Sequence, residues 1–260
     1  MTSIPSQAGA PSEAPILLVT GGSRGIGAAT ALRAARAGWD VAVNFTRDQA
    51  AAEKVAAGVR EVGRRALVVQ ADVASEPDVM AMFAAVDAGL GRLTGLVNNA
   101  GVVDMPSRVD EMTLERLQRM WAINLTGPFL CARESVRRMS RRHGGDGGVI
   151  VNLSSAAAKL GSPAQYVDYA ASKGGIDTFT HGLALEVANE GVRVNGVRPG
   201  IIDTDIHASG GLPDRVAQMA PNVPMKRAGS ADEVAAAIVW LLSGDASYVT
   251  GTTIDVTGGR

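Results

Sequence analysis

A tyrosine and a lysine stand four residues apart in the segment Tyr169-Ala-Ala-Ser-Lys173. The segment opens a run to about residue 190 with apolar residues at three- and four-residue steps, namely Ile176, Phe179, Leu183 and Val187. This period predicts an amphipathic helix. Because positions four apart on a helix lie on one face, the Tyr169 and Lys173 side chains can point into one site.

The pair could carry out proton transfer. A phenol is a poor acid or base at neutral pH, with an unperturbed pKa of about 10. A nearby ammonium favours the phenolate and lowers that pKa. Tyr169 could therefore exchange a proton with an alcohol or carbonyl oxygen. Such a pair often arises by chance, so its meaning depends on the elements that surround it.

A glycine-rich loop near the start of the chain follows a short apolar run. Residues 15–20, Pro-Ile-Leu-Leu-Val-Thr, suit a strand buried on both faces. Gly21-Gly-Ser-Arg-Gly-Ile-Gly27 comes next, and an Ala-rich helical pattern continues to Gly38. Strand, glycine turn and helix are the context of a dinucleotide-binding loop, in which the helix N-terminus faces a pyrophosphate. The alternative is an ordinary glycine-rich turn.

Strands and helices alternate through the rest of the chain. Further strands are expected at residues 41–45, 66–70, 93–97, 149–153, 192–197 and 253–256. The pattern predicts an α/β fold with a Rossmann-type, doubly wound parallel sheet, helices on both faces and a single domain. Such sheets bind ligands beyond the carboxyl ends of their strands. Polar or glycine-rich segments fall at those ends, namely 21–27, Asp72, 98–101, Ser154/Ser155 and 199–204.

The domain is expected to span residues 15–260, after a flexible tail at residues 1–14. Residues 204–227 are punctuated by Gly and Pro and lack one clean period. They are a candidate lid over a substrate, or an ordinary surface excursion.

Composition excludes several classes of function. A net charge of -1 over 260 residues gives no support to a nucleic-acid partner. No stretch has the length of a membrane span, and the first residues do not read as a signal peptide, so a cytoplasmic location is expected. Cys131 is a single cysteine, and His143, His181 and His207 are scattered, so no metal site is expected. No Gly-x-Ser-x-Gly elbow of a hydrolase is present.

The combination of motifs resembles the short-chain dehydrogenase/reductase family from about residue 15 to 260. The motifs are Thr20-Gly-x-x-x-Gly-Ile-Gly27, Asn98-Asn-Ala-Gly101, Asn124, Ser155, Tyr169-x-x-x-Lys173 and Pro199-Gly200. The resemblance implies a seven-stranded Rossmann-type sheet and an assembly of two or four copies, of which we expect the homotetramer.

The resemblance also implies four catalytic residues. Tyr169 would be the general acid in reduction and the general base in oxidation. Lys173 would lower the Tyr169 pKa and bind the nicotinamide ribose. Ser155 would hydrogen-bond the substrate oxygen. Asn124 would interrupt its helix and hold a water in a proton relay.

Two neighbouring residues are rivals for these roles. Ser155 is preferred to Ser154 because the family's serine is the second of such a pair, although the gap from Ser155 to Tyr169 is one residue longer than is commonest. Tyr166 has alanine, not a cation, four residues later, so we interpret it as a substrate-side or packing residue.

The cofactor is expected to be NADP(H), with NAD(H) as the alternative. NAD-binding proteins place an acid after the second strand, where this chain has Phe45. Arg47 and Arg24 resemble the positions that hold a 2′-phosphate, unless they are merely solvated. The expected cofactor-binding residues are Gly21, Ser23, Arg24, Gly25, Ile26, Gly27, Asn44, Arg47, Asp72, Val73, Asn98, Ala100, Gly101, Tyr169, Lys173, Pro199, Gly200, Ile202 and Thr204.

The sequence therefore predicts an NADP(H)-dependent oxidoreductase that interconverts a carbonyl and a secondary alcohol on a small molecule. One alternative is an NAD-dependent sugar or alcohol dehydrogenase, and another is a non-catalytic cofactor-binding regulatory or scaffold protein. Ketoacyl thioesters, sugars, steroids and small ketones all remain open as substrates.

Overall fold

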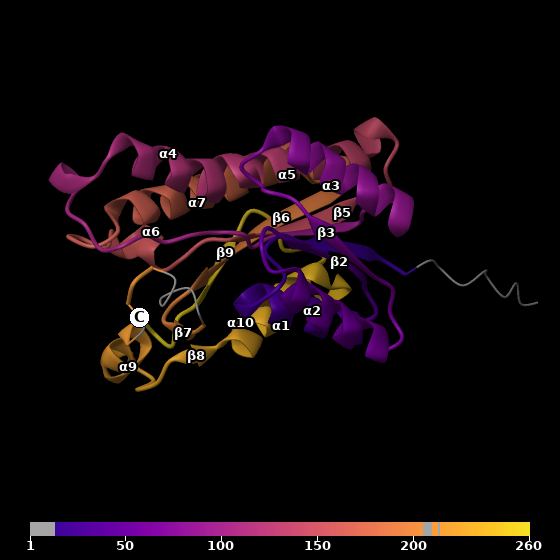
Figure 1. The fold of residues 1–260 in the computed structure, drawn as a ribbon. Coiled ribbons are helices and arrows are strands. Elements are labelled where there is room, and N and C mark those ends of the chain that lie inside the picture. Colours follow the sequence, from indigo (N-terminus) through magenta and orange to yellow (C-terminus); the bar gives the residue numbers. More distant parts are fainter. Residues whose placement is uncertain (1–13, 205–209, 213) are drawn as a thin grey trace, which may run out of the picture.

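A seven-stranded parallel sheet forms the centre of the molecule (Figure 1). The computed structural model describes residues 14–204, 210–212 and 214–260. The strand order is β3-β2-β1-β4-β5-β6-β9, and every neighbouring pair is parallel. The strands are β1 (Ile16–Val19), β2 (Asp40–Phe45), β3 (Ala66–Gln70), β4 (Gly95–Asn98), β5 (Gly148–Leu153), β6 (Val192–Pro199) and β9 (Thr253–Val256). The predicted doubly wound fold is confirmed.

Helices cover both faces of the sheet (Figure 1). One face carries α1 (Gly25–Arg36), α2 (Gln49–Glu61) and α10 (Ala231–Leu242). The other carries α3 (Glu76–Gly89), α4 (Leu114–Trp121), α5 (Gly127–Met139) and α7 (Val167–Val187). Shorter helices are α6 (Ala157–Leu160), α9 (Arg215–Met219) and the 3-10 turns Val109–Glu111, Arg141–His143, Ala188–Glu190, Ala220–Asn222 and Gly244–Ala246.

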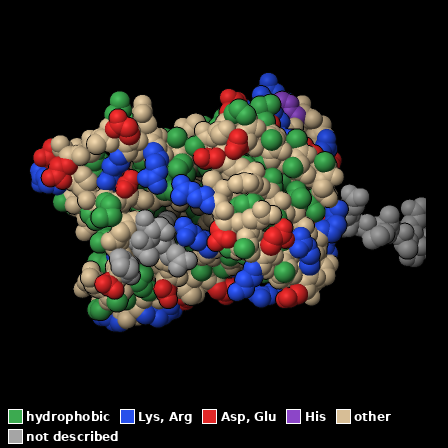
Figure 2. All heavy atoms as spheres, viewed as in Figure 1, with side chains coloured by type: hydrophobic (Ala, Val, Ile, Leu, Met, Phe, Trp, Pro, Cys, Tyr) green, Lys and Arg blue, Asp and Glu red, His purple; other side chains and the backbone are tan. Residues whose placement is uncertain are grey.

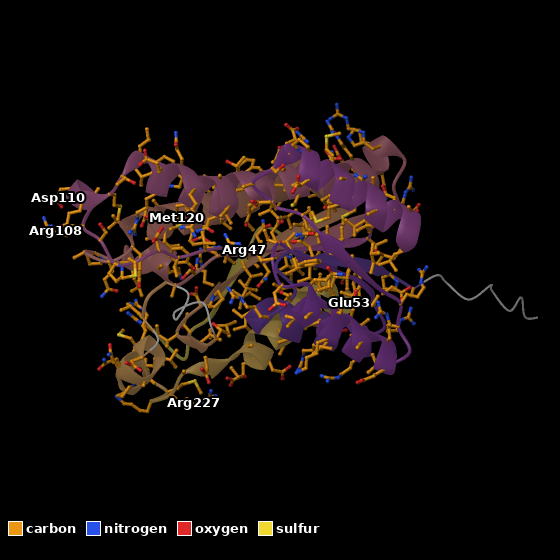
Figure 3. The ribbon with its side chains drawn as sticks, viewed as in Figure 1. Arg47, Glu53, Arg108, Asp110, Met120 and Arg227 are labelled. Carbon is orange, nitrogen blue, oxygen red and sulfur yellow. The ribbon has the colours of Figure 1, made fainter. Side chains whose placement is uncertain are left out.

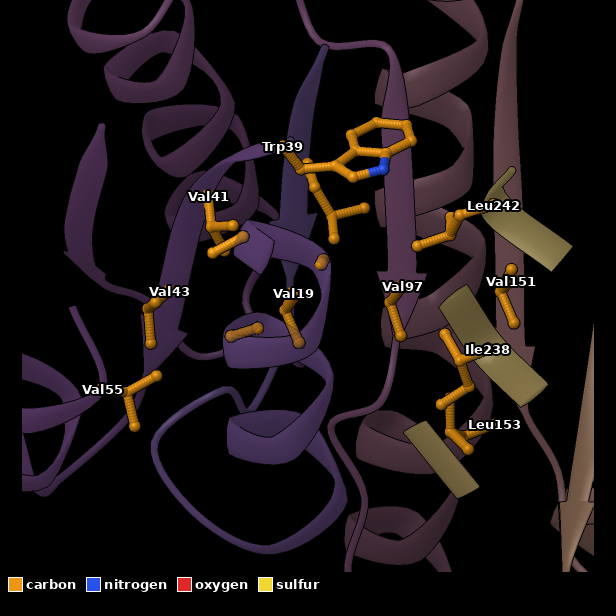
Figure 4. Packing of buried hydrophobic residues seen from close by; sticks show 14 of the residues in the cluster. Val19, Trp39, Val41, Val43, Val55, Val97, Val151, Leu153, Ile238 and Leu242 are labelled. Carbon is orange, nitrogen blue, oxygen red and sulfur yellow. The ribbon is translucent and has the colours of Figure 1, made fainter. Parts of the chain in front are cut away.

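The core has two layers, one on each side of the same sheet. Along β1, Leu17 and Val19 pack in one layer, and Ile16 and Leu18 pack in the other. Figure 4 shows the first layer, where Val97, Val151 and Leu153 of neighbouring strands lie around Ile238 of α10. Because successive side chains on a strand point to opposite faces, a strand buried on both faces must be apolar throughout. This explains the continuous apolar run in β1.

The carboxyl ends of the strands form one edge of the sheet. Val19 pairs with Val97, Val97 pairs with Val151, and Leu153 pairs with Val197. The strand order reverses between β1 and β4, because β1 leads to β2 on one side and β4 leads to β5 on the other. Such a reversal opens a crevice at this edge, which is where parallel sheets bind ligands. The segments that the sequence placed at strand ends are therefore neighbours in space.

The long helix expected from Thr113 to Met139 is broken in its middle. A π-helical turn, Ala122–Thr126, separates α4 from α5 and contains Asn124. The interruption implied by the family resemblance is thus present. π-Turns are often found at functional sites.

A second sheet of two short strands was not predicted. β7 (Ile202–Asp203) pairs with β8 (Gly229–Ser230) in parallel. The pairing ties the segment after β6 to the start of α10, whose Ser230 and Glu233 form a capping box. The whole candidate lid, residues 204–227, lies between these two strands. Residues 205–209 and 213 of it lie outside the described residues, as do residues 1–13 of the expected tail. The lid and the tail stay predictions.

Candidate active site

The glycine loop needs glycine for a steric reason. A Cβ atom on Gly27 would lie 2.4 Å from the Gly21 carbonyl oxygen and 2.5 Å from Asn99 Nδ2. Gly21 and Gly25 have φ angles of +60° and +54°, which side chains rarely allow. The loop therefore folds tightly against the start of α1, where free N–H groups can face an anion.

Asn99 joins the loop to the end of β4. Its Nδ2 donates to the carbonyl oxygens of Thr20 and Gly21 at 2.8 and 2.9 Å. Thr20 Oγ1 accepts from the backbone N–H groups of Asn99 and Ala100, both at 3.0 Å. Asn99 was not among the expected site residues, although it lies in the Asn98–Gly101 motif. The structure gives it a supporting role in fixing the loop.

Asn44 holds the same loop from the side of β2. Its Oδ1 accepts from the Gly21 N–H at 3.1 Å, and its Nδ2 donates to the Ala71 carbonyl at 3.1 Å. The side chain is buried. Asn44 was expected to contact the cofactor; the structure shows it shaping the loop, and the direct contact stays a prediction.

Asn98 likewise turns into the interior. Its Nδ2 donates to Asn152 Oδ1 at 2.9 Å and to the Pro128 carbonyl at 3.2 Å, so it ties β4 to β5 and α5. The side-chain N–H groups of Asn98 therefore already have hydrogen-bond partners within the protein. A cofactor contact of Asn98 also stays a prediction.

Lys173 reaches the end of β5 from α7. Its side chain is 4% exposed, and Nζ donates to the Leu153 carbonyl at 2.6 Å. Burial lowers the Lys173 pKa to about 8, although the nearby Asp177 carboxylate acts in the opposite direction. The ammonium is therefore poised to lose its proton close to physiological pH.

Tyr169 and Ser155 meet across the gap between α7 and β5. Burial raises the pKa of the Tyr169 phenol, and a hydrogen bond with Ser155 opposes this rise. The Lys173 Nζ lies 5.8 Å from the centre of the Tyr169 ring. Lys173 was expected to lower the Tyr169 pKa. In the structure burial has the largest effect on this pKa, and it raises it.

The two serines of the Ser154–Ser155 pair have different partners. Ser154 is buried and its hydroxyl donates to the Lys173 carbonyl at 3.1 Å, which fastens β5 to α7. Ser155 is partly exposed, and its Oγ accepts from the Ala157 N–H at 3.1 Å. Only Ser155 also meets Tyr169. The geometry therefore favours Ser155 as the residue that faces a substrate oxygen.

Asn124, in the π-helical turn, lies near Lys173 and contacts the segment that follows β4. Its Oδ1 accepts from the Val102 N–H and its Nδ2 donates to the Val102 carbonyl, both at 2.8 Å. A Cβ on Gly101 would lie 3.3 Å from Asn124 Oδ1 and 3.7 Å from Lys173 Nζ. The structure thus brings Asn124, Gly101 and Lys173 to one point, although they are far apart in the sequence.

Tyr166, the rival tyrosine, stands just before α7. Its ring is buried, and the Arg215 guanidinium lies 5.0 Å from the ring centre. Burial raises the Tyr166 pKa, while the charges of Arg215 and Arg116 act in the other direction. Tyr166 packs against α9, in keeping with a packing or substrate-side residue.

Cationic side chains gather around a hollow in the middle of one face of the molecule (Figure 2). Arg47 lies near the middle of the same view (Figure 3). It is exposed, and it makes no hydrogen bond or ion pair with any residue that the structure describes. Phe45, at the position of the ribose-binding acid, is buried. Arg24, also exposed, directly precedes α1.

The remaining expected cofactor residues frame the loop. The Thr204 methyl carbon lies 3.5 Å from where a Gly25 Cβ would stand. Asp72 accepts the Ala74 N–H at 2.9 Å and helps to line a shallow depression with Thr46 and Gln70. Other members lie in or next to these segments, namely Ser23 and Ile26 in the loop, Val73 after Asp72, and Pro199, Gly200 and Ile202 before Thr204.

Two further chemistries find no support in the part of the chain that the structure describes. No group of three His, Cys, Asp or Glu side chains there could hold a metal ion. Burial raises the pKa of the Cys131 thiol to about 12, which makes it a poor nucleophile. Within the same residues, no helix is both long and apolar enough to cross a membrane.

Comparisons with known proteins identify the family. A family model described as enoyl-(acyl carrier protein) reductase matches residues 21–260. The uncharacterized oxidoreductase YgfF of Escherichia coli is 56% identical over 94% of this chain and 99% of its own length. The 3beta-hydroxysteroid dehydrogenase 1 of Eggerthella lenta is 40% identical over 94% of this chain and 92% of its own length.

A solved structure shows the same likeness. A short-chain dehydrogenase from Burkholderia cenocepacia in complex with NADP superposes with a TM-score of 0.86 at 33% identity, covering 94% of this chain and 97% of the other. Sequence, fold and the arrangement of the site lead to one conclusion. This chain is an oxidoreductase of the short-chain dehydrogenase/reductase family.

Proposed function

We propose that the protein is an NADP(H)-dependent oxidoreductase that interconverts a carbonyl and a secondary alcohol on a small molecule. The observation that carries the proposal is the meeting of Ser155 with Tyr169, and of Lys173 with Asn124, beside the glycine loop. A non-catalytic cofactor-binding protein would not need these four side chains together.

The site has the features that a nicotinamide cofactor needs. The backbone of the glycine loop approaches so closely that a Cβ at Gly27 cannot fit, which leaves N–H groups open to a pyrophosphate. Lys173 would bind the ribose next to the nicotinamide, and Asp72 would lie at the adenine end. When bound, the cofactor supplies or accepts the hydride.

The chain's own residues handle the substrate oxygen. In reduction, Tyr169 donates its phenolic proton to the oxygen on which negative charge develops, and in oxidation the phenolate takes the proton back. The Ser155 hydroxyl donates a hydrogen bond to the same oxygen. The Lys173 ammonium stabilises the phenolate, and Asn124 holds Val102 in place and positions a water for proton relay.

The preference for NADP(H) is supported by charge at the mouth of the site. The exposed Arg47 offers five N–H donors in a planar fork, and no described residue uses them. The buried Phe45 stands where NAD-binding proteins have an acid, so no carboxylate at this position would repel a phosphate. The Burkholderia relative was solved with NADP, and the likeness to a hydroxysteroid dehydrogenase favours a secondary alcohol and its ketone as the reacting pair.

The protein is further proposed to be a cytoplasmic homotetramer. Phe129 of α5 and Phe179 of α7 stack with ring centres 3.7 Å apart, and Phe129 is still 48% exposed. Trp121 of α4 and Leu185 of α7 are 45% and 70% exposed. A gathering of large apolar side chains on one face is typical of an interface between copies.

The function is tested by following NADPH oxidation with a panel of ketoacyl thioesters, keto sugars, ketosteroids and small ketones. We expect at least one class to be reduced, with a higher kcat/KM for NADPH than for NADH. The catalytic proposal would be contradicted if NADPH oxidation with every compound were no faster than in a blank without protein. The cofactor preference would be contradicted by a higher kcat/KM for NADH.

A further inference from the structure

The helix that carries Tyr169 begins only two residues before it. α7 starts at Val167, and Tyr166, at its N-cap position, makes no side-chain capping hydrogen bond. The first N–H groups of a helix have no partner within it, so an uncapped first turn tends to fray. The preceding loop is also strained, because Ser162 and Ala164 have φ angles of +47° and +55°. The turn that holds Tyr169 therefore needs support from elsewhere.

An ion pair from α4 supplies that support. Arg116 Nε donates to Asp168 Oδ2 at 2.8 Å, and Arg116 Nη2 donates to Asp168 Oδ1 at 3.3 Å. The Asp168 side chain is 0% exposed and the Arg116 side chain 12% exposed. The two groups are thus joined by two hydrogen bonds away from water, a geometry far more rigid than that of an exposed pair.

The same arginine holds the loop that follows the Asn98–Gly101 motif. Arg116 also donates to the Met105 carbonyl at 2.6 Å, and the Ser107 N–H donates to the Gln165 carbonyl at 3.0 Å. Met105 and Ser107 of this loop are thereby tied to Arg116 and to the segment just before α7. Any shift of this loop would be passed to Asp168 and hence to the residue next to it.

We propose that Arg116 and Asp168 are positioning residues, which lock the first turn of α7 to α4 and so hold the Tyr169 phenol at the substrate oxygen. This inference rests on the proposed function, because Tyr169 must be the acid or base for its position to matter. Neither residue takes part in the chemistry. A misplacement of about 1 Å at a reacting group can lower a rate about 100-fold.

The first test is Asp168→Asn, which keeps the shape of the side chain and removes its charge. We expect kcat to fall about 10-fold or more, while the Kd for NADPH, measured by fluorescence, changes less than about 2-fold. The matched control is Arg119→Gln. It breaks the Arg119–Asp104 pair, also between α4 and this loop, whose side chains are 52% and 28% exposed. The control should keep kcat within about 2-fold.

A second variant separates position from stability. Arg116→Met with Asp168→Leu replaces the buried pair by apolar groups, an exchange that often preserves or improves folding. We expect its Tm to stay near that of the wild type while its kcat remains low. A double variant with wild-type kcat, or an Asp168→Asn variant with unchanged kcat, would overturn the inference.

Failure of the positioning role and failure of the proposed function give different results. If the wild type reduces no carbonyl, the function itself is refuted. If the wild type turns over and the variants match it, Tyr169 remains the acid and base and only the positioning role is lost.

Discussion

The replacement Gly27→Ala tests the glycine loop as a cofactor site. The new Cβ would lie 2.4 Å from the Gly21 carbonyl oxygen and 2.5 Å from Asn99 Nδ2. Ordinary contacts of a Cβ begin near 3.4 Å, so the loop must move by about 1 Å. Overpacking of this kind typically costs about 1–3 kcal/mol.

Movement of the loop also threatens the hydrogen bonds that fix it. Asn99 Nδ2 would lose its bonds to Thr20 and Gly21, which are 2.8 and 2.9 Å long. A hydrogen-bonding group left unsatisfied in the interior costs about 1–3 kcal/mol, and the better helix propensity of Ala returns only about 1 kcal/mol. Together with the overpacking, we therefore expect a net loss of about 1–5 kcal/mol in the free energy of unfolding.

Binding should suffer more visibly than folding. A pyrophosphate-binding loop displaced by about 1 Å should raise the Kd for NADPH about 10- to 100-fold, that is, by about 1.4–2.8 kcal/mol. NADPH fluorescence titration and thermal melting measure the two effects. The control is Gly89→Ala at the end of α3, where the new Cβ would meet Leu67 at an ordinary 3.4 Å. Wild-type affinity and Tm in Gly27→Ala would refute the steric argument.

Three further predictions concern pH, the cofactor and assembly. For carbonyl reduction, kcat/KM should fall as pH rises above about 8. Burial lowers the Lys173 pKa to about 8, so the ammonium loses its proton in this range. A pH profile that stays flat to about pH 9.5 would contradict this. Arg47→Ala should raise KM for NADPH about 10-fold and leave KM for NADH unchanged, since a charged hydrogen bond contributes about 1.5–3 kcal/mol; equal effects on both cofactors would be the contrary result. Light scattering at micromolar concentration should give the mass of a tetramer, because the face around Phe129 and Phe179 is apolar and partly exposed; a monomeric mass would exclude the proposed interface.

The sequence was enough to predict the layers of the fold and the strand ends that the structure brings to one edge of the sheet. The four residues of β1 are all buried, which is why that run is apolar without alternation. The order strand, glycine turn, helix located the loop, because each of its constraints is local. Asn124 could be expected in an interrupted helix only through the family resemblance, since its own helical pattern shows no break.

The details that sequence reasoning missed are long-range or depend on the direction of one side chain. Asn44 is the last residue but one of β2 and Asn98 is the last of β4, and only the neighbouring strands decide that their amides turn inward. Asn99 contacts residues 78 and 79 positions away. Arg116 and Asp168 are 52 positions apart. No periodicity or propensity encodes such pairs, because they arise only once the elements have packed.

The central claim is that the Tyr169 phenol transfers the proton of the reaction. The most direct measurement compares kcat of Tyr169→Phe with that of Tyr166→Phe, together with the Kd of each variant for NADPH. General acid–base groups contribute about 10²–10⁴-fold. We therefore predict that Tyr169→Phe loses at least about 100-fold in kcat with its NADPH affinity kept, while Tyr166→Phe retains most of its turnover. A Tyr169→Phe enzyme that keeps a third or more of the wild-type kcat, with Tyr166→Phe losing it instead, would contradict the claim.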